Sequence, residues 1–151
     1  MIGCIIQARM GSTRLPGKVM KLLDDKNPSL YYTINQLKNS LNVDKIIVAT
    51  TKLNEDDVIE KISKNNKIDY FRGSSENVLE RFYECAKKFQ IETIVRITAD
   101  CPLIDPKIVD SIIQIFNSGK YDYVHNMEPR TFPDGLDTEV FSFKILEEAH
   151  K

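Results

Sequence analysis

The stretch IGCIIQARMGSTRLPGK, residues 2–18, decides the fold class of this chain. It starts with the β-branched run Ile2–Ile6, which is typical of a buried strand, and continues directly into a loop with two glycines and three basic side chains. Apolar strands without polar alternation are typical of parallel sheets that helices cover on both faces. Residues 2–18 therefore predict the first strand of an α/β domain, with a chemically unusual loop at its carboxyl end.

Further apolar runs predict strands at intervals along the chain. Each is short and rich in β-branched residues, as expected of a strand inside a sheet. The clearest runs are Lys45–Ala49 and Thr93–Thr98, and weaker ones lie at 68–71, 121–124 and 138–141. With Ile2–Ile6, the chain therefore offers six candidate strands.

The segments between these runs carry apolar residues at helical spacing. Asn27 and Pro28 are expected to be the cap and first residue of the first helix, and Asp105 is the expected cap of the fourth, which stops at Gly119. The predicted helices lie at 30–41, 54–62, 79–89 and 108–116. Alternating strands and helices predict a three-layer αβα architecture with a mostly parallel sheet, built as a single domain over residues 1–151.

The second predicted helix begins with acidic residues. Asn54 has the character of its cap, and Asp56 and Asp57 lie in its first turn, where carboxylates complement the helix dipole. The same two acids follow the strand that ends near Ala49, which leaves open a contact with a ligand at the strand end. The simpler interpretation is that they serve the helix dipole.

The overall composition excludes several classes of protein. The chain has 151 residues, with 21 Lys and Arg against 22 Asp and Glu, and this near-balance argues against a general nucleic-acid binder. No apolar run approaches the roughly 18 residues that span a bilayer, and no secretory signal is visible. Its three cysteines are widely spaced and form neither a disulfide framework nor a metal pair. We expect a soluble cytoplasmic protein without a nucleic-acid or membrane partner.

Residues 8–18, here named the cationic loop, follow the first predicted strand. The basic residues in this loop and just beyond it are Arg9, Arg14, Lys18 and Lys21. Gly11 and Gly17 let the backbone approach a ligand closely, and consecutive N–H groups can form an anion-binding nest. Arginine offers forked donors to phosphate oxygens, whereas lysine is a mobile point charge. The loop predicts a polyphosphate pocket; the alternative is an ordinary surface loop with solvated charges.

Known nucleotide and catalytic patterns fit less well. The Walker A pattern fails, because five residues separate Gly11 from Gly17 and Val19 stands where a magnesium-binding Ser or Thr is needed. His125 and His150 are the only histidines, too few for a zinc site with cysteines, and no nucleophile-elbow pattern occurs. A site that combines phosphate and a metal ion is the best motivated.

Asp100 is the second residue that suggests chemistry. It stands where the apolar strand Thr93–Thr98 ends, a costly position for an unpaired carboxylate. Mg²⁺ commonly binds through one or two carboxylates together with phosphate oxygens, so Asp100 is the predicted metal ligand and Mg²⁺ the predicted cofactor. The alternative is that Asp100 caps a turn before Pro102.

Four motifs in order resemble the cytidylyltransferase family that includes CMP-KDO and CMP-sialic acid synthetases. They are closest to the branch named after spore coat polysaccharide biosynthesis protein F. The motifs are QARMGSTRLPGKVM (7–20), FRGSSENVLERF (71–82), VRITADCPLIDP (95–106) and FPDGLDTEVFSF (132–143). Family members are longer and carry a second metal-binding Asp in a C-terminal part without counterpart here. Because residues 142–151 look like a helix cut short, we expect a C-terminally truncated chain.

The resemblance implies a nucleotide-diphosphosugar-transferase-like fold and the transfer of CMP from CTP to a sugar acid or sugar phosphate, with release of pyrophosphate, for surface polysaccharide. It also suggests a homodimer. The triphosphate would be held by Arg9, Arg14 and Lys18 with the backbone of Gly11 and Ser12. The base would face Ala8, and the nucleoside pocket would be bordered by Arg72 and Asn77. The predicted catalytic residues are Arg9, Lys18 and Asp100, and the sugar candidates are Asn126, Asp134 and Glu139.

Other functions stay open at this point. A glycosyltransferase that consumes a nucleotide-sugar can share such a sheet, but its common Asp-x-Asp pattern is missing, because Cys101 and Pro102 follow Asp100. A chain that binds CTP without turnover is a second alternative. A third is a phosphate-binding domain without nucleotide preference.

Overall fold

A computed structural model describes residues 1–130 and 132–151. They form one six-stranded sheet in the order β3-β2-β1-β4-β6-β5, in which β6 pairs antiparallel with both β4 and β5 and the other pairs are parallel. The strands are β1 (Ile2–Gln7), β2 (Lys45–Thr51), β3 (Asp69–Gly73), β4 (Thr93–Thr98), β5 (Tyr123–His125) and β6 (Glu139–Ser142). The predicted mostly parallel sheet is thus confirmed, with the first strand of the sequence at its centre.

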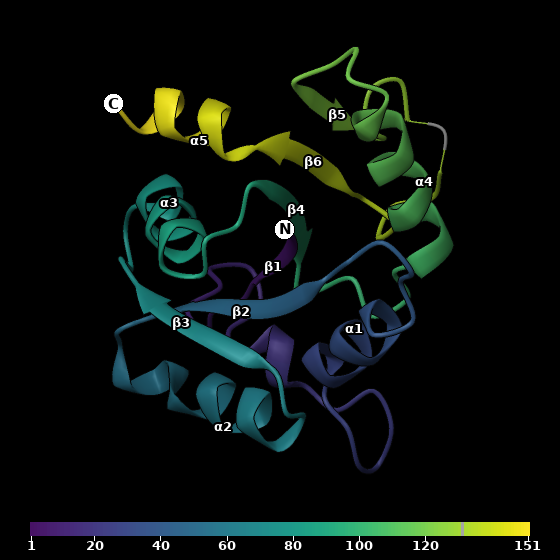
Figure 1. Ribbon diagram of the computed structural model, residues 1–151. Coiled ribbons are helices and arrows are strands. Elements are labelled where there is room, and N and C mark those ends of the chain that lie inside the picture. Colours follow the sequence, from purple (N-terminus) through teal and green to yellow (C-terminus); the bar gives the residue numbers. More distant parts are fainter. Residues whose placement is uncertain (131) are drawn as a thin grey trace.

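Helices cover both faces of this sheet, as predicted. Figure 1 shows β2 and β3 crossing between α3 on one side and α2 on the other. The helices are α1 (Ser29–Leu37), α2 (Asp57–Asn65), α3 (Val78–Lys88), α4 (Pro106–Asn117) and α5 (Phe143–His150), with the 3-10 turns η1 (Lys18–Met20) and η2 (Asn54–Asp56). Helices α1, α2 and α4 share a hydrophobic cluster on one face, and α3 and α5 share another on the opposite face.

The alternation of side chains along β1 explains why both faces must be covered. Cys4 and Ile6 belong to the cluster under α1, α2 and α4, whereas Ile5 belongs to the cluster under α3 and α5. All three are fully buried, since successive residues of a strand point to opposite faces. A strand with this pattern is stable only between two layers of helices.

Two details of the first predicted helix are wrong. Pro28 is the N-cap rather than the first helical residue, and the helix ends at Leu37. Leu41, expected on the buried face, is 92% exposed. The cause is a distant carboxylate: Asp110 on α4 accepts hydrogen bonds from the backbone of Leu41 and Asn42 and so fixes a loop where the apolar spacing predicts helix.

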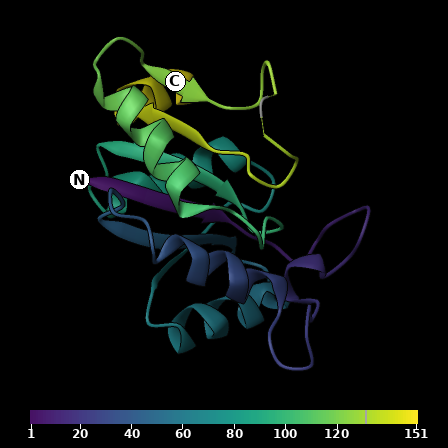
Figure 2. The same cartoon turned by 90° about the vertical axis from the view of Figure 1, so that its right-hand side faces the viewer.

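The parallel pairing of β1 sets the position of the cationic loop. β1 lies between β2 and β4, with Gln7 opposite both Ala49 and Thr98. Carboxyl ends of parallel strands meet at one edge of a sheet, where ligands of such folds usually bind. Figure 2 shows the N-terminus at one edge of the molecule and the segment after β1 projecting from the opposite edge. No helix in the described ranges is both long and apolar enough to cross a membrane.

Gly3 on β1 is expected to be intolerant of any side chain. An ideal Cβ at this position would lie 2.5 Å from Cδ1 of Ile91, in a packed interior. We predict that Gly3→Ala lowers the free energy of unfolding by about 1–3 kcal/mol, the usual cost of overpacking a core. Urea denaturation at neutral pH measures it, and an unchanged midpoint would show that Ile91 moves aside freely.

Candidate functional site

The two unusual loops of the sequence meet at the carboxyl edge of the sheet. Lys18, at the end of the cationic loop, donates a hydrogen bond to Asp100, with 2.5 Å between Nζ and Oδ2. The residues are 82 positions apart in the chain, and the pairing of β1 with β4 brings them together. Both side chains are partly exposed, at 27% and 40%. The site therefore presents a cation and a carboxylate that a ligand can reach.

The charge of Asp100 is stabilised in this position. Partial burial by itself would raise the pKa of the carboxyl group, but hydrogen bonds from Lys18 and Thr98 outweigh it and hold the pKa below its ordinary value. Asp100 therefore carries a negative charge at neutral pH.

A magnesium ion fits the donor set at Asp100. The described residues contain no group of three or more His, Cys, Asp or Glu side chains able to hold a metal. Mg²⁺ does not require such a cage, since it retains water and takes oxygen ligands from substrate phosphates together with one or two carboxylates. A single Asp beside the cationic loop is compatible with that mode of binding.

The backbone of Met10 organises the cationic loop. Its carbonyl accepts hydrogen bonds from the backbone N–H groups of Ser12 and Gly17, at 2.7 and 2.9 Å, and so closes the loop on itself. Gly17 has φ of 68°, a left-handed conformation that glycine adopts without strain. Lys18 follows Gly17 directly, so the closure of the loop fixes the position of the lysine backbone.

Asp56 holds the N–H group of the same residue, Met10. It is fully buried, and its carboxylate accepts hydrogen bonds from the N–H of Met10 at 2.7 Å and from the N–H of Thr51 at 3.2 Å. It also accepts one from the Thr51 hydroxyl group. Asp56 stands at the N-cap of α2, where the sequence predicts that it serves the helix dipole, but its side chain makes no capping hydrogen bond to that helix.

The other residues predicted for the triphosphate differ in accessibility. Arg9 and Arg14 are exposed, and neither forms an ion pair with any residue in 1–130 or 132–151. Gly11 is exposed and Ser12 is half-buried, and the Ser12 N–H already donates to the carbonyl of Met10. Ala8 is 1% exposed and packs in the core, and its N–H donates to the carbonyl of Ala49.

Arg72 and Asn77, predicted to border the nucleoside pocket, are engaged in local structure. Arg72 forms ion pairs with Asp57 and Glu60 on α2 and donates to the carbonyls of Thr51 and Leu53. Asn77 caps α3 by accepting a hydrogen bond from the N–H of Glu80. Neither observation tests the predicted ligand contacts, but Arg72 would have to leave its carboxylates to make one.

Arg81 is a charged residue of this region that the sequence patterns did not reveal. It is fully buried in the first turns of α3 and donates through Nη1 to the carbonyl of Ser74. Its Nε and Nη2 have no hydrogen-bond partner in the described structure. Burial, and secondarily the nearby Arg9, lower the pKa of Arg81. An arginine at helical spacing has no signal that separates it from a solvated one.

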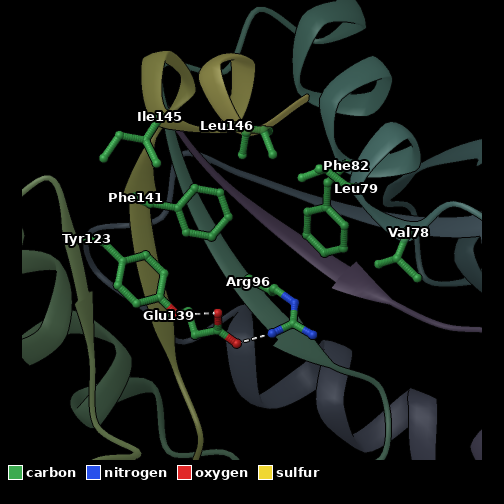
Figure 3. Close-up of a pocket in the computed structure, with 10 residues that line it drawn as sticks. Val78, Leu79, Phe82, Arg96, Tyr123, Glu139, Phe141, Ile145 and Leu146 are labelled. Atoms are coloured by element: carbon green, nitrogen blue, oxygen red, sulfur yellow. Dashed lines mark hydrogen bonds and ion pairs between the residues drawn. The ribbon is translucent and has the colours of Figure 1, made fainter. Parts of the chain in front are cut away.

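A pocket of about 370 Å³ lies beside the site, between α3, α5 and the strands β4, β5 and β6. Its walls are mostly apolar, with Phe82 and Phe141 facing each other across it (Figure 3). One end is polar: Glu139 pairs with Arg96 and accepts a hydrogen bond from the hydroxyl of Tyr123 at 2.6 Å. Burial and this bond raise the pKa of Tyr123.

The polar end of the pocket is connected to the cationic loop. Arg96 also donates to the side chain of Gln7, the last residue of β1, with 3.3 Å between Nη2 and Oε1. Glu139 stands in an apolar run, where burial requires a partner, and Arg96 is that partner. The signal in the sequence that could have revealed Arg96 is the place of a charged residue inside the apolar strand Thr93–Thr98.

The remaining sugar candidates lie in different surroundings. Asn126 is buried and bridges its loop, donating to the carbonyl of Leu136 and accepting from the N–H of Thr138. Asp134 is exposed and pairs with Arg130. The structure therefore brings Glu139, but neither Asn126 nor Asp134, to the wall of the pocket.

Comparison with known proteins identifies the family. The family model described as cytidylyltransferase matches residues 3–151. The spore coat polysaccharide biosynthesis protein SpsF of Bacillus subtilis is 36% identical over 148 residues, which cover 94% of this chain and 59% of that protein. The chain thus spans about three fifths of the length of this curated relative.

Solved structures give the same result. A cytidylyltransferase from Leptospira borgpetersenii superposes with a TM-score of 0.93 at 41% identity, over 99% of this chain and 63% of that one. A CMP:2-keto-3-deoxy-manno-octonic acid synthetase solved in complex with CTP aligns with a TM-score of 0.75 at 16% identity, over 99% of this chain and 77% of that one. The second likeness shows the fold.

Gly17 is predicted to be required for the closed loop. The backbone at Gly17 has φ of 68°, and a Cβ at this position would lie 3.2 Å from Cε of Met10. We expect Gly17→Ala to cost about 1 kcal/mol of stability, the usual penalty for left-handed backbone, and to weaken binding of inorganic tripolyphosphate. Urea denaturation and calorimetry measure the two effects.

Gly119 provides the matched control. It has φ of 74°, and a Cβ would meet no atom within 4 Å. Gly119→Ala should therefore show a similar loss of stability with unchanged tripolyphosphate binding. Equal binding by both variants would contradict the role assigned to Gly17.

Proposed function

The chain belongs to the cytidylyltransferase family, and we propose that it transfers CMP from CTP to a sugar acid or sugar phosphate, with release of pyrophosphate, in the synthesis of surface polysaccharide precursors. The observation that carries the proposal is the meeting of Lys18 and Asp100 beside the exposed Arg9 and Arg14. A triphosphate needs cations and, in most enzymes, a metal-binding carboxylate, and both lie at one edge of the sheet.

In this proposal the cationic loop binds the triphosphate. Arg9 and Arg14 supply forked donors, Lys18 supplies a point charge, and backbone N–H groups of the loop complete the cradle. Since the two arginines carry no partner in the described ranges, no internal ion pair has to break when phosphate binds. Lys18 would exchange some of its contact with Asp100 for phosphate oxygens.

The reaction itself requires positioning and charge neutralisation more than a protein nucleophile. An acceptor oxygen, the hydroxyl of a sugar acid or a phosphate oxygen of a sugar phosphate, forms a bond to the α-phosphorus of CTP. The bond from that phosphorus to the bridging oxygen of the β-phosphate breaks, pyrophosphate leaves, and any proton on the acceptor oxygen is released to solvent. Lys18 and the arginines stabilise the charge that develops on pyrophosphate. When bound at Asp100, Mg²⁺ supplies further neutralisation of that charge.

The pocket at Glu139 supports an acceptor site next to the nucleotide. It lies on the β4 and β6 side of the cationic loop, and Gln7 and Arg96 connect the two regions. The name of the SpsF relative includes polysaccharide biosynthesis, and the name of the synthetase solved with CTP includes a sugar acid. These names support a sugar acceptor for this chain.

Nucleotide binding is the first test of the proposal. We expect calorimetry with Mg²⁺ to show tighter binding of CTP than of UTP, ATP or GTP. Equal binding of all four would leave only a polyphosphate loop, and no binding by the folded chain would contradict the proposal. CTP binding without any CMP transfer would identify a binding chain without turnover.

Substitution of Lys18 tests the phosphate contact. We predict that Lys18→Ala lowers CMP transfer by about two orders of magnitude or more, since it removes charge stabilisation in the transition state, while the fold persists. Lys64→Ala is the control, because Lys64 also forms an ion pair, with Glu60 on α2, at 2.7 Å. Steady-state kinetics and circular dichroism measure the outcome, and wild-type turnover by Lys18→Ala would remove the lysine from the site.

Substitution of Asp100 tests the metal. Asp100→Asn should abolish the dependence of CTP binding on Mg²⁺, because an amide is a poor substitute for an ionised carboxylate at a hard cation. Asp69→Asn is the control, since Asp69 forms a similar ion pair with Lys45. A wild-type Mg²⁺ titration in Asp100→Asn would show that Asp100 is structural.

A further inference from the structure

We infer that Asp56 is a positioning residue for the cationic loop: by accepting the hydrogen bond of the Met10 N–H, its buried carboxylate sets the position of the loop and of Lys18. This inference rests on the proposed function, since it assigns a role in binding the triphosphate. Asp56 lies outside the loop by sequence, 46 positions from Met10.

The surroundings of Asp56 explain why the contact is strong. The carboxylate is fully buried and forms no ion pair within 4 Å in the described ranges, although the charge of the buried Arg81 acts on it from farther away. A buried charge is costly unless hydrogen bonds satisfy it, and here the Met10 N–H and two donors of Thr51 do so. Hydrogen bonds to an ionised group are shorter and stronger than neutral ones. Losing the Met10 contact would therefore leave part of a buried charge unsatisfied.

A structural role in α2 does not account for this arrangement. Asp56 occupies the N-cap position of that helix, yet its side chain accepts no hydrogen bond from the helix backbone. Both oxygens are directed instead to the end of β2 and to the loop after β1. The carboxylate thus links two neighbouring strand ends at the edge where the ligand is expected.

The effect of Asp56 passes through Met10 to the rest of the loop. The N–H of Met10 is held by Asp56, while its carbonyl holds the N–H groups of Ser12 and Gly17. Gly17 precedes Lys18, which reaches Asp100. The N–H and the carbonyl of Met10, which belong to two successive peptide groups, therefore connect a buried anchor to both ends of the loop and to the lysine.

Close approach of the loop to the segment that carries Asp56 strengthens the argument. An ideal Cβ on Gly11 would lie 3.0 Å from Oε1 of Glu55, the residue before Asp56. The loop therefore lies against η2 and follows its position. A loop ordered before the ligand arrives binds more tightly, because less conformational entropy is lost on binding.

The test compares three variants. Asp56→Asn keeps the shape and removes the charge, Met10→Pro removes the N–H and keeps the carboxylate, and Asp110→Asn is the matched control. Asp110 is also a buried carboxylate that holds a loop, through Ser40, Leu41 and Asn42, and it lies on α4. All three are measured for amide hydrogen exchange by NMR and for binding of CTP and of inorganic tripolyphosphate.

We expect Asp56→Asn and Met10→Pro to weaken binding of CTP and tripolyphosphate about tenfold or more, and Asp56→Asn to speed exchange of the Met10 amide by a similar factor, as loss of a charge-assisted hydrogen bond implies. Asp110→Asn should bind CTP and tripolyphosphate within about twofold of wild type, because a distant loss of stability leaves the structure of the cationic loop unchanged. If Asp56→Asn does not fold, Met10→Pro carries the binding test alone.

Two results would overturn the assignment. One is wild-type binding and wild-type Met10 exchange in Asp56→Asn; the other is an equal loss of binding in Asp110→Asn. Failure of the proposed function gives a different result: wild-type protein would bind neither CTP nor tripolyphosphate, while exchange of the Met10 amide would still report whether Asp56 holds the loop.

Discussion

The parallel pairing of β1 with both β2 and β4 is the constraint on which the candidate site depends. It places Gln7 opposite Ala49 on one side and Thr98 on the other. Three chain segments must therefore leave the sheet at one edge, and their side chains meet there whatever their separation in sequence. The Lys18–Asp100 pair and the Asp56–Met10 hydrogen bond both follow from this arrangement.

The charges at this edge divide into two kinds. Asp56 is buried and satisfied by hydrogen bonds, so it serves as a fixed part of the framework. Arg9 and Arg14 are exposed without an ion pair in the described ranges, so they are free to meet an anion. Lys18 lies between the two kinds, because its bond to Asp100 is accessible to a ligand. A polyanion would thus meet mobile cations on a loop that the interior holds in place.

Local signals were sufficient for most of the fold. The strand Thr93–Thr98 occurs with the predicted bounds, and Asp105 caps α4 as expected, because β-branching and capping act within a few residues. The first helix shows the limit. Its apolar spacing continues to Leu41, but Asp110, about 70 positions away, fixes the chain there as a loop. No pattern near Leu41 contains that information.

By itself, the sequence determined the fold class, the cationic loop, Asp100 as its acidic counterpart and the family motifs, since each is a property of residue type at short spacing. Only the tertiary structure decided which charges pair. In the structure Asp56 accepts a hydrogen bond from the Met10 N–H, Arg72 forms ion pairs with two acids of α2, and Arg96 forms an ion pair with Glu139. The physical reason is that the partner of a buried charge is chosen by strand order and register, which bring together residues far apart in the chain.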